Sequence, residues 1–278
     1  MPTKYRFLNE KKAHLHQINT NGEWQPLIGT STASKMAGGD KGALIWWGAE
    51  MAGVALLEMG VEKSETIRAE YELVKGIADV KEKKKAMDAL QKKYPAFKVA
   101  RFAHYEAKND AADKGVDLHA ELEKYVKHCL ETSDGIPQVH SDNERVKNFA
   151  EWAVKNVDKF LFSEGHCYSE RLFLGGIADC AAKLKTGELV IIDFKSAKSP
   201  YYEHYCQIAL YAIQISENGV FDADGNKVME PFKASVYIVI PFGAQDFKVV
   251  PRYDVEEFRK SGEAAVALYK HSQQFEIR

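Results

Sequence analysis

Three residues within the stretch 169–215 carry side chains that can bind a metal ion and stabilise a reacting phosphate: Asp179, Asp193 and Lys195. Asp193 and Lys195 are two residues apart in a run typical of a strand, so their side chains point to the same face. Two carboxylates held close together repel each other unless a cation lies between them. Hard oxygen ligands select Mg²⁺ or Mn²⁺, and a fixed ammonium stabilises negative charge on a phosphate. These residue types therefore predict metal-assisted hydrolysis of a phosphodiester.

A β-hairpin has to bring these side chains together. Two strand-like runs flank Thr186-Gly187, a pair of residues typical of a turn. Asp179 lies near the start of the first run and Asp193 near the end of the second, so the folded hairpin places the two carboxylates side by side. Asp193 also interrupts an apolar run that is expected to be buried, where a carboxylate is costly unless it is paired or bound to a metal. This cost favours a metal site over two surface aspartates.

Four short motifs follow one another here, in the order Glu170, Gly176-Ile177-Ala178-Asp179, Ile192-Asp193-Phe194-Lys195-Ser196 and Gln207-Ile208-Ala209-Leu210-Tyr211. This ordered set resembles the PD-(D/E)XK nuclease superfamily, and within it the RecB-type and phage-type exonuclease branch. The resemblance covers residues 115–211 well and the rest of the chain weakly. Ala178 stands where the family name has proline, a relaxation that is common in this superfamily. The pattern Asp-x-Lys often occurs by chance, whereas the full set ending in Gln-x-x-x-Tyr is much more specific.

The resemblance implies which groups hold the metal: the side chains of Asp179 and Asp193, the backbone carbonyl of Phe194, and His119. The histidine lies in Lys-Gly-Val-Asp-Leu-His-Ala-Glu, which looks like the helical histidine motif of the RecB-type branch, and imidazole suits Mn²⁺. Taken alone, a histidine at the edge of an apolar stripe is more often simply packed. Lys195 is expected to orient or deprotonate the attacking water and to stabilise the phosphate charge. A salt bridge to Asp193 is its structural alternative, and both can hold.

The other residues that the resemblance implies surround this centre. Glu170 is expected on the strand before the first aspartate, near the metal, with an ion pair as its structural alternative. Gln207 and Tyr211 are four residues apart and share a helix face. In similar proteins Gln207 would hold a water or a phosphate oxygen and Tyr211 would contact the substrate backbone or support the lysine; a buried polar pair is the alternative. Ser196 and Lys198 are expected to bind substrate, or to be ordinary surface residues.

The composition is that of an ordinary globular protein: 278 residues, 45% hydrophobic and 28% charged. No apolar run is long enough to span a membrane, and the first residues lack the apolar core of a signal peptide, which predicts a cytoplasmic location. The four cysteines are Cys129, Cys167, Cys180 and Cys206. They form no Cys-x-x-Cys pair and lack the tight C-terminal triplet of iron–sulfur relatives, so reduced, independent thiols are expected.

The formal net charge is −2, yet the distribution of charge matters more for a nucleic-acid enzyme than its sum. A basic segment consists of Lys81-Glu82-Lys83-Lys84-Lys85 followed by Lys92, Lys93, Lys98 and Arg101. Such a segment can follow a phosphate backbone. A solvated helix face has the same composition. The sequence leaves both interpretations open.

The predicted order of elements is helix, three strands, helix and strand. This is the order of the restriction-endonuclease-like αβββαβ core, an α/β fold with a mixed central sheet, here with additional N-terminal helices. Helices are predicted at about 31–59, 64–94, 102–131, 143–159, 201–217 and 254–274, with a break near Gly38 in the first and near Gly115 in the third left open. Strands are predicted at about 167–174, 177–184, 188–196, 234–241 and 246–252. The helix at 102–131 carries an apolar stripe at helical spacing, formed by Leu118, Leu122, Tyr125, Val126 and Cys129. The first 30 residues are expected to form a short hairpin or an extended arm. Residues 1–100 are predicted to be this arm and a helical segment packed on the core, and residues 101–278 the nuclease core.

Together these features predict a Mg²⁺- or Mn²⁺-dependent deoxyribonuclease, an exonuclease in DNA recombination, repair or end processing. DNA is the expected partner, and the resemblance adds a single-strand annealing protein or a helicase. Two alternatives are a structure- or sequence-specific endonuclease of the same fold and a catalytically silent nucleic-acid-binding module. The intact Asp, Asp, Lys set argues against the silent module, because binding alone does not require a paired-carboxylate metal site.

Overall fold

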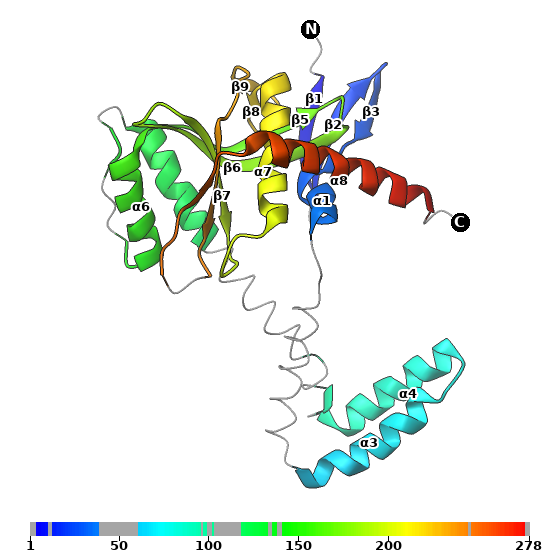
Figure 1. Cartoon of the computed structure of the whole chain (residues 1–278). Helices are drawn as coiled ribbons and strands as arrows, with labels where there is room; N and C mark the ends of the chain where they lie inside the picture. The colour runs from blue at the N-terminus through cyan, green and yellow to red at the C-terminus, as the bar shows by residue number, and fades with distance from the viewer. Residues whose placement is uncertain are drawn as a thin grey trace. The chain divides into compact units, whose positions relative to one another are not determined.

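The chain divides into two compact units, residues 1–39 with 115–278 and residues 40–114. The computed structural model (Figure 1) describes residues 4–10, 13–38, 61–95, 97–98, 102, 118–132, 135–137, 141–243 and 246–275. The predicted boundary at residue 100 does not coincide with this division, because the N-terminal strands belong to the same unit as the C-terminal sheet.

A mixed eight-stranded sheet forms the centre of the first unit (Figure 1). Its middle is the antiparallel run of β5 (Val157–Ser169), β6 (Leu174–Leu184) and β7 (Leu189–Lys195). β10 (Val236–Pro241) lies parallel to β7, so a crossover must connect the two. The outer strands are β4 (Ile28–Gly29), which pairs with β6, β8 (Val220–Phe221), β9 (Lys227–Met229) and β11 (Val250–Arg252). The predicted α/β fold with a mixed central sheet is confirmed.

Helices cover both faces of this sheet, because its central strands are apolar on both sides. The covering helices are α6 (Glu144–Asn156), the helical residues 118–131, α7 (Tyr202–Asn218) and α8 (Val255–Phe275). Val190 and Ile192 of β7 share a core with α6 and residues 118–131, whereas Ile191 shares one with α7. The alternation of the strand therefore directs Asp193 and Lys195 toward α7. The predicted apolar stripe of residues 118–129 is buried at all five positions.

The N-terminal segment, predicted as a hairpin or an extended arm, forms a three-stranded antiparallel sheet. Its strands are β1 (Tyr5–Glu10), β2 (Ala13–Thr20) and β3 (Glu23–Pro26). Asn21 and Gly22 join β2 to β3 with φ angles of 54° and 92°, as a type I′ turn requires. After β4 the chain enters α1 (Thr30–Ser34), where the Thr30 hydroxyl donates a hydrogen bond to the Gly175 carbonyl at 3.2 Å. These contacts attach the segment to the start of β6, at Leu174 and Gly175.

The helix predicted at 31–59 is interrupted at Gly38, the break that the sequence left open. α1 passes into the short 3₁₀ helix η1 (Lys35–Ala37), and Gly38 is then extended, with φ −66° and ψ 139°. The glycine thus ends the helix that the apolar pattern alone would have prolonged. Residues 39–60 lie outside the described residues, and so do residues 103–117 of the helix predicted at 102–131.

The strand predicted at 167–174 begins much earlier and ends earlier: β5 starts at Val157 and stops at Ser169. The helix before it ends at Asn156 instead of residue 159. Register shifts near Lys159 and Phe162 interrupt the pairing of β5 with β6, so the side chains do not alternate regularly there. The short strands β8 and β9 were not predicted, since two and three residues give no periodic signal.

The second unit contains the charged helices predicted at 64–94. They are α3 (Val61–Lys75) and α4 (Val80–Lys93). Asp79 begins α4 by accepting a hydrogen bond from the Glu82 amide, and Lys93 donates to Glu70 of α3 at 2.6 Å. The basic residues 81–85 lie along α4. Among the described residues, no helix is long and apolar enough to cross a membrane.

Candidate metal centre

The β6–β7 hairpin brings the two predicted aspartates together. Gly187 makes the turn with a φ of 103°, and Cys180 pairs with Ile192, which places Asp179 next to Asp193 on the neighbouring strand. Asp179 Oδ2 accepts a hydrogen bond from the Phe194 amide at 2.7 Å. This contact fixes the carboxylate at the end of the hairpin and confirms the predicted turn.

Asp193 and Lys195 form a buried ion pair, as their spacing predicts. The lysine ammonium donates to Asp193 Oδ1 at 2.8 Å and lies 2.7 Å from Oδ2. Oδ2 is buried, and among the described residues the Lys195 ammonium is its charged partner. Burial raises the pKa of Asp193 to about 6 against the opposing effect of the lysine, so the carboxyl is ionised at neutral pH. Burial alone would lower the pKa of Lys195, but the Asp193 and Asp179 carboxylates outweigh it and raise that pKa.

His119 reaches the same centre from the helical residues 118–131. Its Nε2 lies 3.2 Å from Asp179 Oδ2, and its ring meets the edge of Phe194 with 5.6 Å between centroids. The bond to Asp179 raises the pKa of His119 to about 9 in spite of partial burial. Without a metal the imidazole is therefore protonated at neutral pH. A ligand role requires the loss of that proton, which a divalent cation promotes.

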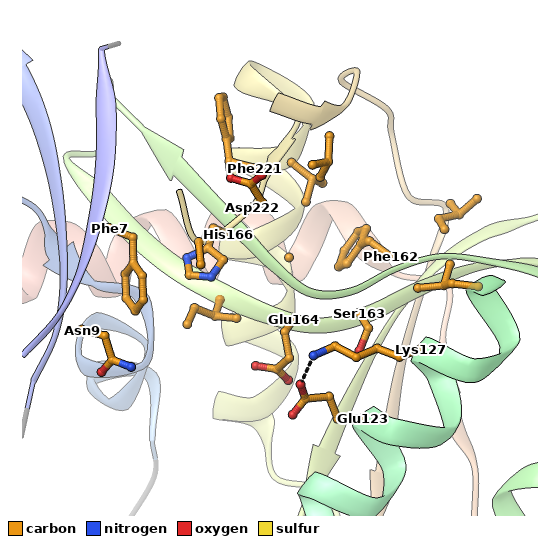
Figure 2. A pocket seen from close by; sticks show the side chains of 17 residues that line it. Phe7, Asn9, Glu123, Lys127, Phe162, Ser163, Glu164, His166, Phe221 and Asp222 are labelled. Atoms are coloured by element: carbon orange, nitrogen blue, oxygen red, sulfur yellow. Dashed lines mark hydrogen bonds and ion pairs between the residues drawn. The ribbon is translucent and has the colours of Figure 1, made fainter. Parts of the chain in front are cut away.

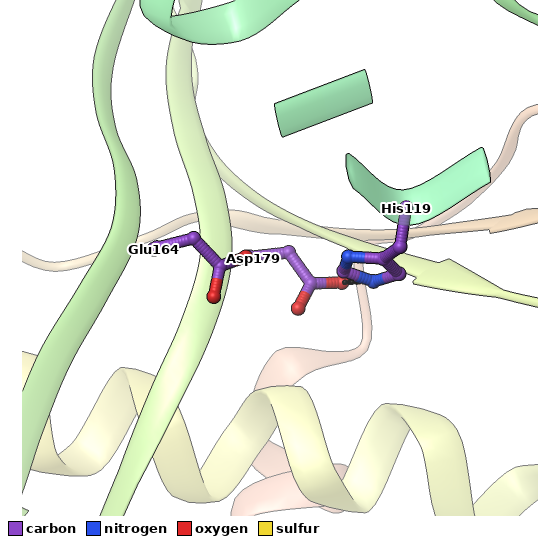
Figure 3. A group of neighbouring side chains, drawn as sticks. All are labelled: His119, Glu164 and Asp179. Atoms are coloured by element: carbon purple, nitrogen blue, oxygen red, sulfur yellow. Dashed lines mark ion pairs between the residues drawn. The ribbon is translucent and has the colours of Figure 1, made fainter. Parts of the chain in front are cut away.

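Glu164 is a member of this centre that the sequence did not reveal. It lies on β5 opposite Asp179, because the neighbouring pairs are Ser163 with Cys180 and Gly165 with Ala178. His119, Glu164 and Asp179 present ligand atoms within 4.8 Å of one another (Figure 3). Its backbone φ of 51° is unusual for a residue with a side chain and marks local strain. Burial and the Asp179 charge raise the pKa of Glu164 to about 7.

Glu170 does not lie where it was predicted. It follows the end of β5 in the turn to β6, and it forms an ion pair with Lys4 at 2.5 Å. Asp179 is five residues along β6 from Leu174, the first residue after that turn, which is roughly 17 Å of extended strand. The predicted strand at 167–174 caused this error, because the true β5 places Glu164 opposite Asp179.

Gln207 and Tyr211 form the predicted pair on α7. The Gln207 amide donates a hydrogen bond to the Tyr211 hydroxyl at 2.9 Å. Burial, followed by the charge of Asp193, raises the pKa of Tyr211 well above its usual range, so the phenol is neutral and close to the carboxylates. Gly176 allows this approach, since a Cβ there would lie 2.7 Å from the Tyr211 ring.

The remaining predicted residues lie at the end of β7. Phe194 is buried, and its amide already binds Asp179. Ser196 and Lys198 are exposed in the bend that follows the strand. His204, in the first turn of α7, accepts a hydrogen bond from the Tyr201 amide, and burial together with Lys195 lowers its pKa to about 4. The imidazole of His204 is therefore neutral beside the lysine.

The donor set fits a metal ion. One imidazole nitrogen and two carboxylates converge in His119, Glu164 and Asp179, and the buried Asp193 carboxylate, paired with Lys195, lies beside them. Carboxylates held this close repel one another, and a cation between them offsets that repulsion. Oxygen-rich ligand sets of this kind suit hard divalent ions. These residues can therefore hold a metal ion next to a fixed ammonium.

No protein-family model matches the sequence, and no curated protein matches it. Among solved structures, the crystal structure of SSO0001 is similar over 64% of this chain and 67% of that one, with 14% sequence identity and a TM-score of 0.29. Similarity at this level supports no conclusion about family or activity, so the geometry of the centre has to carry the functional argument.

Proposed function

We propose that this protein is a Mg²⁺- or Mn²⁺-dependent DNA nuclease of the PD-(D/E)XK superfamily, acting as an exonuclease in DNA recombination, repair or end processing. One observation carries the proposal: Asp179, Asp193 and Lys195 converge at one end of a hairpin, with Glu164 and His119 beside them. Three carboxylates, an imidazole and an ammonium in a partly buried site are suited to metal-assisted hydrolysis.

The arrangement of elements supports the same proposal. Helical residues 118–131, then β5, β6 and β7, then α7 and the parallel strand β10 follow the order αβββαβ of the restriction-endonuclease-like core. In this order β6 supplies Asp179, β7 supplies Asp193 and Lys195, and α7 supplies Gln207. The helix α6 is inserted between the first helix and β5.

The residues of the centre divide the chemistry among them. His119, Glu164 and Asp179 would hold the ion, with Asp193 and the Phe194 carbonyl as further oxygen donors. When bound, a divalent ion supplies Lewis acidity and lowers the pKa of water. The Lys195 ammonium, held by Asp193, binds a non-bridging phosphate oxygen and stabilises charge that develops on it. Gln207 orients a water or a phosphate oxygen over the site, and Glu164 takes the position that was predicted for Glu170.

The proposed partners are DNA and, by the family resemblance alone, a single-strand annealing protein or a helicase. Ser196 and Lys198 are exposed where β7 ends, so they are accessible to a DNA backbone that crosses the centre. Tyr211 is buried, which favours a supporting role over direct contact with the substrate.

The test compares end-labelled linear DNA with closed circular DNA, each single- and double-stranded, in Mg²⁺, Mn²⁺ or EDTA. Wild type is compared with Lys195→Ala and with Lys183→Ala, a matched control whose half-buried lysine lies on β6 of the same hairpin, 3.4 Å from Asp158. The proposal expects metal-dependent digestion of linear DNA that Lys195→Ala abolishes and Lys183→Ala leaves intact.

Two other outcomes would change the conclusion. Cleavage of closed circles would show an endonuclease of the same fold, because an exonuclease needs an end. DNA binding without cleavage in either metal would contradict the nuclease and favour the catalytically silent module.

A further inference from the structure

A pocket of about 560 Å³ opens directly beside the metal centre (Figure 2). Glu164 belongs to both, since it presents its carboxylate to His119 and Asp179 and also lines the pocket. The pocket lies between β1, the helical residues 118–131 and the strands β5 and β8. A ligand there would be separated from the candidate metal site by one side chain.

Aromatic rings form one end of the pocket. Phe7 of β1 meets the His166 ring edge-on, with 4.4 Å between centroids and 64° between planes. Phe221 of β8 pairs with His166 across the sheet and lines the same end. His166 and Phe221 are buried and Phe7 is partly exposed, so Phe7 is the ring of the three that a ligand in the pocket can reach. Planar ligands stack on such rings, and stacking tolerates every nucleobase because each has a π-face.

The charges of the pocket exclude a phosphate group as its occupant. Three carboxylates line it, those of Glu123, Glu164 and Asp222, and among the described lining residues Lys127 is the lone lysine or arginine. Lys127 is already paired with Glu123. An anion placed there would meet like charge without a partner. A neutral ring with polar edges suits the pocket better, and the volume lies within the range of small-ligand sites.

We propose that this pocket takes the nucleobase of a nucleotide adjacent to the scissile phosphate of single-stranded DNA. The inference rests on the proposed function, which brings DNA to the neighbouring centre. The phosphate lies at Lys195, and the base beside it turns across Glu164 into the pocket, where the partly exposed Phe7 contacts the ring and the buried His166 supports Phe7. The Asn9 amide at the rim offers hydrogen bonds to the polar edge of the base.

The test is a scan of abasic sites. Short fluorescein-labelled single strands, each with one tetrahydrofuran residue in place of a nucleotide at successive positions from the end, are bound to the full chain in EDTA, so that no cleavage occurs. The variants are Phe7→Ala, Ala223→Trp and the control Tyr253→Ala. Ala223 is exposed and lines the pocket, so tryptophan there fills it without disturbing the core, whereas the exposed Tyr253 is not among the lining residues.

The proposal expects one position at which loss of the base weakens binding to wild type by about tenfold, the effect of one stacked base. Both pocket variants should bind the intact strand about as weakly as wild type binds that abasic strand, and should lose the positional effect. Tyr253→Ala should behave as wild type. An abasic scan without such a position, or one that Ala223→Trp leaves unchanged, would contradict the proposal that the pocket binds a nucleobase.

The two proposals can fail separately. Metal-dependent cleavage, combined with an abasic scan that shows no positional effect, would support the nuclease and contradict base binding in the pocket. Weaker binding at one abasic position in EDTA, combined with no cleavage in any metal, would support base binding in the pocket and contradict the catalytic function. Absence of DNA binding in every condition would overturn both.

Discussion

Two clusters of charged side chains in the same unit use similar residues in different surroundings. In the metal centre, the Asp193 side chain is 2% exposed and that of Lys195 is 21% exposed. In the other cluster, Arg171 of the β5–β6 turn bonds Glu217 of α7 at 2.9 Å and Glu263 of α8 at 2.7 Å, with 55% of the arginine side chain exposed. The geometry of the surface cluster is as good as that of the buried one.

The two clusters differ in how well solvent can reach and stabilise their charges. Around Arg171 the solvent satisfies each charge, so the ion pairs add little stability and nothing remains to attract a ligand. Around Asp193 little solvent reaches the charges, and they are balanced incompletely: the carboxylates of Glu164, Asp179 and Asp193 face one ammonium and one imidazole. Good ion-pair geometry alone is therefore a poor guide to a functional site, whereas buried and unbalanced charge is a better one.

The largest expected effect separates the two clusters by activity. Lys195→Ala should reduce the initial rate of linear DNA digestion by roughly 10²- to 10³-fold, since it removes a preorganised charge at the reacting phosphate. Arg171→Ala should leave that rate within about twofold, because its partners lie outside the metal centre. Gel assays of end-labelled substrate measure the digestion rates of both variants. Equal losses of rate would contradict the functional difference between the metal centre and the surface cluster.

A second prediction compares Mn²⁺ binding after substitution of Glu164, which the sequence did not reveal, and of Glu170, which the sequence predicted. Glu164→Gln should weaken Mn²⁺ binding by about 10- to 100-fold in isothermal titration, because it removes a charged oxygen donor next to Asp179. Glu170→Gln should leave Mn²⁺ affinity unchanged, because the Glu170 carboxylate lies in the β5–β6 turn and forms an ion pair with Lys4. The reverse order of affinities would restore the role that the sequence predicted for Glu170.

The third prediction concerns pH. The folded pKa of His119 is raised to about 9, so its protonation contributes stability that is complete below its ordinary pKa of 6.5 and is lost as pH rises to about 9. The folded pKa of Glu164 is raised from 4.5 to about 7, so the ionisation of Glu164 also lowers stability as pH rises from 4.5 to about 7. The metal-free protein should therefore melt at lower temperature at high pH.

Mg²⁺ should reverse this trend, because it binds the deprotonated histidine and the ionised glutamate. The increase in melting temperature on adding Mg²⁺ should be larger near pH 9 than near pH 6.5, as measured by scanning calorimetry. Arg171 titrates far above this range, so Arg171→Ala should show the same pH dependence as wild type. A stabilisation by Mg²⁺ that is equal at both pH values would argue against His119 as a ligand.

The smallest effect is expected for stability at the surface cluster. Arg171→Ala should lower the free energy of unfolding by at most about 1 kcal/mol, and less at high salt, because exposed ion pairs are screened. Urea titrations at low and high salt measure this change. A larger, salt-independent loss would mean that Arg171 holds the β5–β6 turn by packing instead of by charge.

The parts of the site that were predicted depend on local rules. Thr186-Gly187 marks a turn, and the period of two places Lys195 on the face of Asp193, whatever surrounds the hairpin. Gln207 and Tyr211 follow in the same way from the helical period. Such relations need no knowledge of distant contacts, which is why the sequence alone sufficed for them.

Glu164 could not be found in that way, for two physical reasons. Register shifts in β5 obscure the alternation that would show which of its side chains face the site, and a positive φ at Glu164 follows no propensity of glutamate. Its place opposite Asp179 depends on the pairing of β5 with β6, which tertiary packing decides. The short strands β8 and β9 escaped prediction because two and three residues give no periodic signal, and β8 is defined by its pairing with β5, which is distant in sequence.

The attachment of the N-terminal segment to β6 also sets an order of events during synthesis. The Thr30 hydroxyl bonds the carbonyl of a residue 145 positions later in the chain, and β4 pairs with the same strand. At translation speeds of about 5 to 20 residues per second, the segment waits roughly 7 to 30 seconds for β6 to be made. The β1–β3 hairpins can form at once from local contacts, but their docking belongs to the late, slow phase of folding. A nascent chain halted before β6 should therefore expose the N-terminal sheet to proteases, and one halted after it should protect that sheet.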